Sequence, residues 1–139
     1  MINRVLDLEN LSVHQVARPL AETISVEEET PVGEALKLFR EHELTRLPVW
    51  QKRDGVRRVA GLVDLQSLIY LDGLDATRPA GGFLKPALFL DENLRLEQAL
   101  EKMQRGGERL AVVLGRDGRE SGVLSLHDIV KTLFGEVKL

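Results

Sequence analysis

Hydrophobic and polar positions follow the same order twice along this chain. Between residues 24 and 69, a short apolar stretch precedes a helix with apolar residues at helical spacing, an apolar strand, an Asp-Gly turn, a Gly-led strand and a second helix. The same order returns between residues 88 and 130, where Leu96 and Leu100 lie 64 positions after Val32 and Leu36. Because an internal repeat determines the fold that a sequence can adopt, we predict two β-α-β-β-α units.

Local signals place the ends of these elements. Thr30 followed by Pro31 is typical of a helix start, with Thr as the N-cap and Pro as the first helical residue. Asn93 is the cap candidate in the second copy. The pairs Asp54-Gly55 and Asp117-Gly118 predict hairpins. Beyond the turns the two copies lie 61 positions apart, so we expect the first turn to be three residues longer.

The predicted fold class is α/β (α+β). Each copy is too small to bury both faces of its sheet alone, so we expect the copies to pack sheet to sheet with pseudo-two-fold symmetry. Short helices around Ile2 and Val5 and around Val13 and Val16 are expected to cover an open edge or groove of the pair. The predicted organisation is residues 1–19 as a helical lead-in, 20–71 as the first repeat, 72–86 as a Gly- and Pro-rich linker, 87–134 as the second repeat and 135–139 as a tail.

Composition excludes several classes of function. The formal net charge of −3 over 139 residues argues against nucleic acid binding, which requires a basic surface. The chain has no cysteine, which excludes disulfides and thiolate metal sites. No apolar run is long enough to span a bilayer and no signal peptide is visible. His14, His42 and His127 are too scattered for a metal site, and no nucleophile has a partner base, so an enzyme is not expected.

The polar candidates are concentrated at the last predicted helix. Ser125 and Asp128 stand at its start, where unpaired backbone N–H groups and the helix dipole suit an anion. A hydroxyl adds a donor there, and a carboxylate accepts from vicinal sugar hydroxyls. The same Ser-x-x-Asp pattern is close to a capping box, which needs no ligand. From the residues alone, helix capping and ligand binding both remain open.

The repeat resembles the CBS domain. The Leu-Pro-Val strand at residues 47–49 and the stretch at residues 122–128 carry this resemblance, and two copies in tandem resemble a CBS pair, or Bateman module. Residues 2–8, 13–19, 42–49 and 128–137 resemble segments of the CorC/CNNM magnesium and cobalt transporters, a hemolysin-like group in which the CBS pair follows a membrane domain. This chain departs from that group at residues 116–120, which replace an acidic, aromatic Gly-Gly turn.

The resemblance implies an adenine nucleotide site in which Ser125 bonds a phosphate and Asp128 bonds the ribose. In the first copy, Asp64 and Ser67 occupy the matching positions. Because a carboxylate repels phosphate, we expect one competent site. The implied nucleotide-binding residues are Thr23, Ile24, Leu44, Thr45, Leu47, Pro48, Arg109, Ser125 and Asp128. Plain core packing is the alternative for the first-repeat residues, and a surface role is the alternative for Arg109.

The implied function is that of a cytosolic regulatory CBS pair that binds ATP or AMP, with Mg-ATP as one form, and controls an attached membrane magnesium/cobalt ion transporter. The resemblance also implies a homodimer formed through CBS pairs. The implied location is the cytoplasmic face of the cell (inner) membrane, as a soluble part of a longer protein. The alternative function is a structural dimerisation module with no bound nucleotide.

Overall fold

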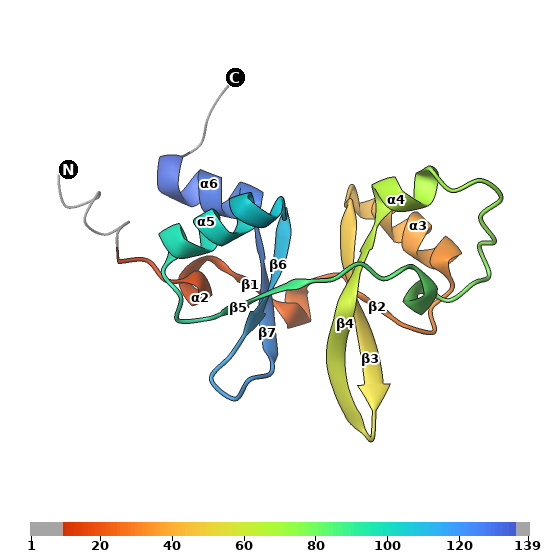
Figure 1. The fold of residues 1–139 in the computed structure, drawn as a ribbon, viewed down its shortest axis with the longest axis horizontal. Helices are drawn as coiled ribbons and strands as arrows, with labels where there is room; N and C mark the ends of the chain where they lie inside the picture. The colour runs from red at the N-terminus through yellow and green to blue at the C-terminus, as the bar shows by residue number, and fades with distance from the viewer. Residues whose placement is uncertain (1–9, 136–139) are drawn as a thin grey trace. The chain divides into compact units, whose positions relative to one another are not determined.

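The sequence repeat forms two α/β units in the computed structural model, which describes residues 10–135. One unit is Ile24–Ala87, and the other combines the residues up to Thr23 with those from Leu88 onward. The described residues form two β-sheets and five α-helices. The predicted mixed α/β class and the two copies are confirmed. In each unit the helices lie on one face of the sheet (Figure 1). Sheet-to-sheet packing of the copies stays a prediction.

The unit of the first repeat contains a three-stranded sheet in the order β2-β3-β4. Strand β2 runs parallel to β3, and β3 runs antiparallel to β4. The parallel pair is joined through helix α3, as a parallel connection requires. The elements are β2 (Val26–Glu27), α3 (Val32–His42), β3 (Arg46–Arg53), β4 (Val56–Asp64), α4 (Leu65–Ile69) and the 3-10 helix η2 (Ala80–Phe83).

The unit of the second repeat contains the same three strands and one more. Its sheet has the order β1-β7-β6-β5, in which the lead-in supplies the edge strand β1. The lead-in elements are α2 (Val13–Val16), β1 (Arg18–Pro19) and the 3-10 helix η1 (Leu20–Glu22). The repeat itself comprises β5 (Leu88–Asp91), α5 (Leu96–Gly106), β6 (Leu110–Leu114), β7 (Glu120–Ser125) and α6 (Leu126–Phe134).

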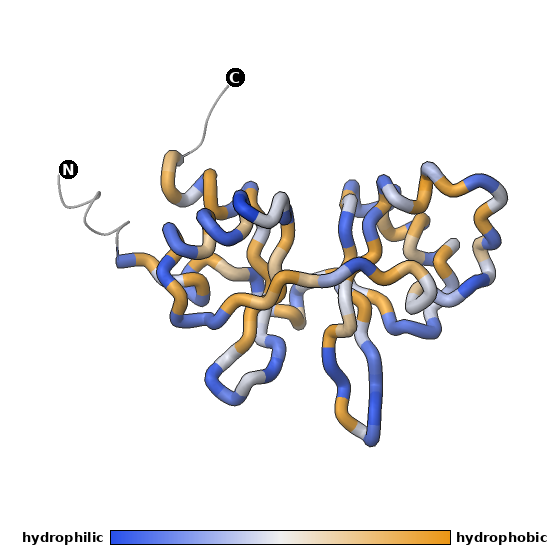
Figure 2. The backbone as a smooth tube through the Cα atoms, viewed as in Figure 1, coloured by the Kyte–Doolittle hydropathy of each residue, from blue (hydrophilic) through white to orange (hydrophobic). Residues whose placement is uncertain are grey.

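Helical periodicity correctly predicts the buried face of each first helix. Val32, Ala35 and Phe39 of α3 are buried, and the residues 64 positions later, Leu96, Ala99 and Met103 of α5, are buried as well. Each helix ends at a residue in the left-handed conformation, Glu43 or Gly107. Apolar residues pack into one core per unit, and hydrophobic and hydrophilic positions alternate along the helices (Figure 2).

Both predicted helix caps are wrong. Helix α3 begins at Val32 with Pro31 as the N-cap residue, and the hydroxyl of Thr30 accepts a hydrogen bond from the N–H of Glu27 instead, at 3.1 Å. Helix α5 begins at Leu96 with Arg95 as the N-cap residue. Asn93 belongs to the preceding turn, where its N–H donates to the carboxylate of Asp91. In both cases a side-chain oxygen, that of Thr30 or of Asp91, accepts a backbone N–H in the turn before the helix.

The two hairpins differ in strand length. The first hairpin closes with the two residues Asp54 and Gly55, both of which have positive φ angles, as a tight primed turn requires. The second hairpin uses residues 115–119 as its turn. The expectation of a longer first turn is therefore wrong, because the extra residues lengthen β3 and β4. The basic residues of that region, Lys52, Arg53, Arg57 and Arg58, consequently lie on paired strands.

The segment between the repeats packs closely on the first unit. Ala80 is fully buried in its core, and the N–H of Val32 donates to the carbonyl of Arg78 at 2.7 Å. Leu62 and Lys85 exchange both backbone hydrogen bonds, at 2.9 and 2.8 Å. The Gly- and Pro-rich segment is thus an ordered part of the first unit, and its backbone hydrogen-bonds to the edge strand β4. The predicted domain boundaries stay a prediction.

The lead-in belongs to the second unit. Helix α2 forms as predicted around Val13, which is fully buried in the core of that unit. Strand β1 pairs with β7, with Arg18 opposite Val123 and Pro19 opposite Gly122. This pairing covers an open edge, as expected for the lead-in. The helix predicted around Ile2 and Val5 lies outside the described residues. Within residues 10–135, no helix is long and apolar enough to cross a membrane.

Candidate functional site

Ser125 caps helix α6. Its hydroxyl oxygen accepts a hydrogen bond from the N–H of Asp128 at 3.0 Å. This is the capping interaction that the sequence offered as the alternative to ligand binding. A hydroxyl has one donor and two acceptor positions, so Ser125 can accept from this N–H while its hydrogen turns from the Asp128 carboxylate to a ligand. Capping and ligand binding are therefore compatible at this residue.

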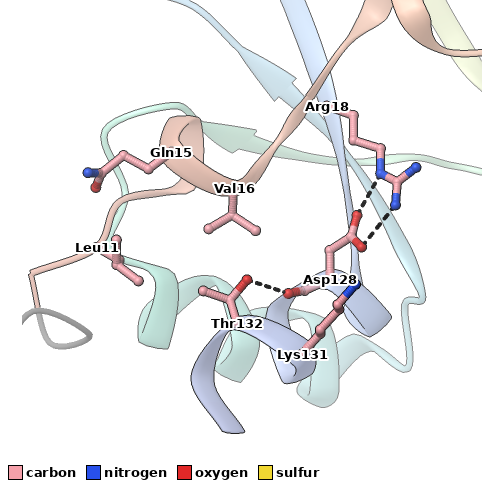
Figure 3. Close-up of a pocket in the computed structure, with 7 residues that line it drawn as sticks. All are labelled: Leu11, Gln15, Val16, Arg18, Asp128, Lys131 and Thr132. Atoms are coloured by element: carbon pink, nitrogen blue, oxygen red, sulfur yellow. Dashed lines mark hydrogen bonds and ion pairs between the residues drawn. The ribbon is translucent and has the colours of Figure 1, made fainter. Parts of the chain in front are cut away.

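Asp128 makes a bidentate ion pair with Arg18. The Nε of Arg18 lies 2.9 Å from Oδ2 of Asp128, and Nη2 lies 3.2 Å from Oδ1 (Figure 3). The Asp128 side chain is only 13% exposed, whereas that of Arg18 is 69% exposed. Burial raises the pKa of Asp128, but hydrogen bonds from Arg18 and Ser125 and the charges of Arg18 and His127 together lower this pKa below its ordinary value. The carboxylate is therefore held ionised.

An open pocket of about 500 Å³ lies beside this ion pair, between α2 and α6. In Figure 3 the Arg18 guanidinium and the Lys131 side chain flank Asp128 at the pocket. Thr132 donates a hydrogen bond to the carbonyl of Asp128 at 2.7 Å. The lining residues are Leu11, Gln15, Val16, Arg18, Asp128, Lys131 and Thr132.

The predicted residues Thr23 and Arg109 lie in the same unit as Ser125 and Asp128. The hydroxyl of Thr23 donates to the carbonyl of Pro19 at 2.9 Å. Two predicted site residues, Thr23 and Asp128, therefore each bond to a residue of strand β1. The Arg109 side chain is exposed, and its carbonyl accepts from the N–H of Leu126 at the first turn of α6.

The other five predicted residues belong to the first unit. Leu47 and Pro48 are buried in β3, and Leu47 is part of the core. Ile24 and Leu44 are half-buried and pack against the same core. Thr45 is exposed, and its hydroxyl accepts from Arg46 at 2.9 Å. Core packing is thus the observed role of Leu47, and an adenine contact for these residues stays a prediction.

The first copy presents the opposite polar arrangement. Asp64 is the N-cap of α4 and accepts from the N–H of Gln66 at 3.4 Å and from the Ser67 hydroxyl at 3.3 Å. The Lys85 amine lies 3.7 Å from the Asp64 carboxylate. A carboxylate therefore occupies the helix start where the second copy has a hydroxyl. Within residues 10–135, no cluster of His, Asp and Glu could hold a metal ion.

Sequence reasoning did not identify Arg18, Lys131 and Thr132 as neighbours of Asp128. Arg18 entered only as part of the lead-in resemblance, and no local spacing connects it with a residue 110 positions away. The sequence feature that could have indicated this contact is the position of Arg18, directly before Pro19 in a segment expected to cover an open edge. Only the pairing of β1 with β7 brings this cation to the start of α6.

The family model of the CBS domain matches this chain twice, over residues 13–72 and 83–135. The chain is a tandem pair of CBS domains. CBS domains are in general regulatory modules without enzymatic activity, and no catalytic family is indicated for this one.

Relatives of this CBS pair occur in larger proteins. It is 26% identical over 139 residues to a chloroplast DUF21 domain-containing protein of Arabidopsis thaliana, a match that covers 99% of this chain and 21% of that protein. The chain therefore spans about a fifth of that relative's length.

Two solved structures are similar to this CBS pair over most of its length. The CBS domain of the bacterial CNNM/CorC family Mg²⁺ transporter in complex with ATP matches with a TM-score of 0.85 and 27% identity, covering 98% of this chain and 96% of that one. CBSX2 in complex with AMP matches with a TM-score of 0.73 and 25% identity, covering 86% and 93%. The predicted resemblance to the CorC/CNNM group is confirmed.

Proposed function

We propose that this CBS pair binds an adenine nucleotide through its second repeat and that binding regulates an attached membrane transport domain. The observation that carries the proposal is the helix start formed by Ser125 and Asp128, in a fold whose similar structures hold ATP and AMP. The first copy has the carboxylate of Asp64 at this position. One nucleotide per chain is the expected stoichiometry.

The phosphate is proposed to bind at the N-terminus of α6. The first backbone N–H groups of a helix have no partner within the helix and attract anions. The hydroxyl of Ser125 accepts from the N–H of Asp128, and its hydrogen, which bonds the Asp128 carboxylate in this structure, would turn to a phosphate oxygen. Arg109 precedes β6, and its exposed side chain is the proposed second phosphate contact.

The sugar and base are proposed to be recognised by different groups. The Asp128 carboxylate accepts from the two ribose hydroxyls, which distinguishes a nucleotide from free phosphate. Thr23 and the first-repeat residues complete the site around adenine, with backbone groups and Thr45 reading the edge of the base. The first-repeat residues are Ile24, Leu44, Thr45, Leu47 and Pro48.

ATP is proposed to bind together with Mg²⁺. ATP carries about four negative charges near neutral pH, because each phosphate group adds about one or two. The net charge of this chain is −3, so a divalent cation on the phosphates would reduce repulsion. The metal would enter on the nucleotide, since the described residues offer no cluster of ligands for it.

The proposed partner is a transport domain of the same longer protein. A similar structure belongs to a CNNM/CorC family Mg²⁺ transporter, so a magnesium/cobalt ion transporter on which this pair acts from the cytoplasmic face of the membrane is the preferred parent. Regulation would be a population shift, in which the nucleotide favours one arrangement of the protein over another.

A second candidate is a structural dimerisation module without nucleotide. The specific observation is that each unit exposes apolar side chains on or just after its last α-helix, Ile69 and Tyr70 at α4 and Val130 and Phe134 on α6. Exposed apolar patches mark interaction surfaces. A homodimer through these helices is compatible with nucleotide binding, and it would also form without it. Sedimentation measurements with and without nucleotide test this part.

Calorimetry and thermal unfolding with ATP, ADP and AMP, each with and without Mg²⁺, test the proposed function. We expect heat and a raised melting temperature with the native chain, and neither with the double variant S125A/D128A. The double variant D64A/S67A removes the matching groups of the first copy and serves as the control, which should still bind. No heat with any nucleotide at millimolar concentration would contradict nucleotide binding and support the dimerisation module.

A further inference from the structure

Arg18 pairs with the carboxylate of Asp128, which is the group proposed to bind the ribose. Arg18 approaches both oxygens of the carboxylate, at 2.9 and 3.2 Å. In this geometry the planar guanidinium covers the outer end of the carboxylate. Two vicinal hydroxyls of a ribose would need the same end of the group. Arg18 and a nucleotide therefore require the same acceptor atoms.

The first unit contains a matching but looser pair. Lys85 lies on the segment that covers the edge of β4, as Arg18 lies on the strand that covers the edge of β7. Its amine lies 3.7 Å from the Asp64 carboxylate, a single contact in place of two short ones. The tight, two-pronged pair is thus found in the copy that carries Ser125 and Asp128.

Arg18 also lies on a short connecting segment. The chain leaves the second unit after Thr23 to enter the first one, and Thr23 is tied back to β1 by its bond to the Pro19 carbonyl. Strand β1 has only two residues, and Pro19 has no N–H to donate to the sheet. The Arg18 ion pair is therefore a side-chain contact that adds to a short backbone pairing in holding this segment on β7.

We propose that Arg18 and the nucleotide ribose compete for Asp128, so that nucleotide binding releases Arg18 and loosens β1 from β7. The inference rests on the proposed nucleotide function and names its regulation. The exposed Arg18 side chain, at 69%, moves into water at little cost, whereas Asp128 stays fixed by the start of α6. By linkage, the pair weakens nucleotide binding by the same factor as the nucleotide weakens the pair.

The variant R18Q tests this competition in the whole chain. Partly exposed ion pairs are weak, so we expect R18Q to tighten binding of AMP and ATP alike, about two- to fivefold in Kd by calorimetry. The matched control K85Q removes the looser cation of the first unit and should leave both Kd values unchanged. Circular dichroism checks that both variants fold.

Three results would overturn the competition. If R18Q weakened ATP more than AMP, Arg18 would be a phosphate ligand. If it weakened both equally, Arg18 would orient Asp128 for the ribose. If both Kd values were unchanged, the pair would be irrelevant to binding.

Hydrogen exchange provides an independent measurement on the same proteins. We expect ATP to speed exchange in the peptide covering residues 10–20 of the native chain, and R18Q to exchange fast there without nucleotide. Protection of this peptide by ATP would overturn the inference. A native chain that binds no nucleotide contradicts the proposed function and this inference together. Binding that S125A/D128A abolishes and R18Q leaves unchanged overturns this inference alone.

Discussion

The two repeats use the same backbone at their second helices but opposite polar chemistry. In each copy the first N–H of the second helix donates to the carbonyl of the residue directly before β3 or β6, from Leu65 to Thr45 and from Leu126 to Arg109, both at 2.9 Å. The cap is the carboxylate of Asp64 in one copy and the hydroxyl of Ser125 in the other. Capping tolerates either residue, but a phosphate tolerates only the hydroxyl. The fold therefore requires a capping residue at this position, and phosphate binding is what would require a hydroxyl rather than a carboxylate.

The segments that cover the two sheet edges also have the same backbone geometry and different side-chain contacts. A Cβ at Gly61 would lie 2.5 Å from the carbonyl oxygen of Lys85, and a Cβ at Gly122 would lie 2.5 Å from that of Arg18. Both glycines thus permit a close backbone approach. The side chain at this point of the covering segment is a cation in both copies. Arg18 pairs closely with Asp128 in the second copy, and Lys85 pairs loosely with Asp64 in the first. Backbone docking is common to both repeats, and the strength of the ion pair differs.

The largest expected effect comes from the equivalent core residues Phe39 and Met103. Both are nearly or fully buried, one in each unit. We expect F39A to lower the free energy of unfolding by about 3–5 kcal/mol and M103A by about 2–5 kcal/mol, because each leaves a cavity. Urea unfolding measures both losses, followed by the fluorescence of Trp50 for F39A in the first unit and by circular dichroism for M103A in the second unit. A loss below about 1 kcal/mol for either variant would contradict an equivalent core role.

The glycine pair tests whether both edges are docked alike. G61A and G122A each place a methyl group against a backbone carbonyl, which we expect to cost about 1–3 kcal/mol through overpacking. Thermal unfolding of both variants measures the cost. The control G115A is milder, because its Cβ would meet its nearest neighbour at 3.5 Å. If only one of the two were destabilised, the docking would not be shared by the repeats.

The caps should be equal in stability and unequal in binding. We expect D64A and S125A each to lower the free energy of unfolding by about 1 kcal/mol, because each removes an N-cap. Only S125A should also reduce the thermal shift produced by ATP. Melting curves with and without ATP measure both quantities. A reduced shift in D64A would mean that the first copy contributes to phosphate binding.

The smallest expected effect is a pH dependence specific to the second copy. Because the pKa of Asp128 is lowered on folding, its ionised form stabilises the protein fully above the unfolded value near 3.8, and this contribution is lost as the pH falls through the lower folded value. We therefore expect D128N to be less stable than the native chain by at most about 1 kcal/mol near pH 7. The two should converge in acid.

Urea unfolding at several pH values between 7 and 3 measures this difference. The variant D64N serves as the matched change in the first copy and keeps a residue that can cap a helix. A native chain and D128N that stay equally far apart down to pH 3 would show that Asp128 does not stabilise the protein through its charge.

Local patterns predicted much of the fold. The spacing of Leu96, Ala99 and Met103 identified a helix face because burial on one side imposes a helical period. Asp54 and Gly55 identified a tight hairpin because both adopt positive φ. The caps predicted at Thr30 and Asn93 were wrong because both residues lie in turns before the helix, where the side chains of Thr30 and Asp91 accept backbone N–H groups. The longer first hairpin was misread because a sequence offset does not reveal whether residues extend a turn or its strands.

The repeat, the CBS fold and the contrast of Ser125 and Asp128 with Asp64 and Ser67 can all be predicted from the order of residues along the chain. These depend on residues close together in the chain, where spacing alone implies structure. The ion pair of Arg18 with Asp128 and the packing of the glycine-rich segment on the first unit are visible only in the folded chain. Such contacts join residues far apart in the chain, as the 110 positions between Arg18 and Asp128 illustrate. They exist because strand pairing fixes which backbone segments, and therefore which charges, become neighbours.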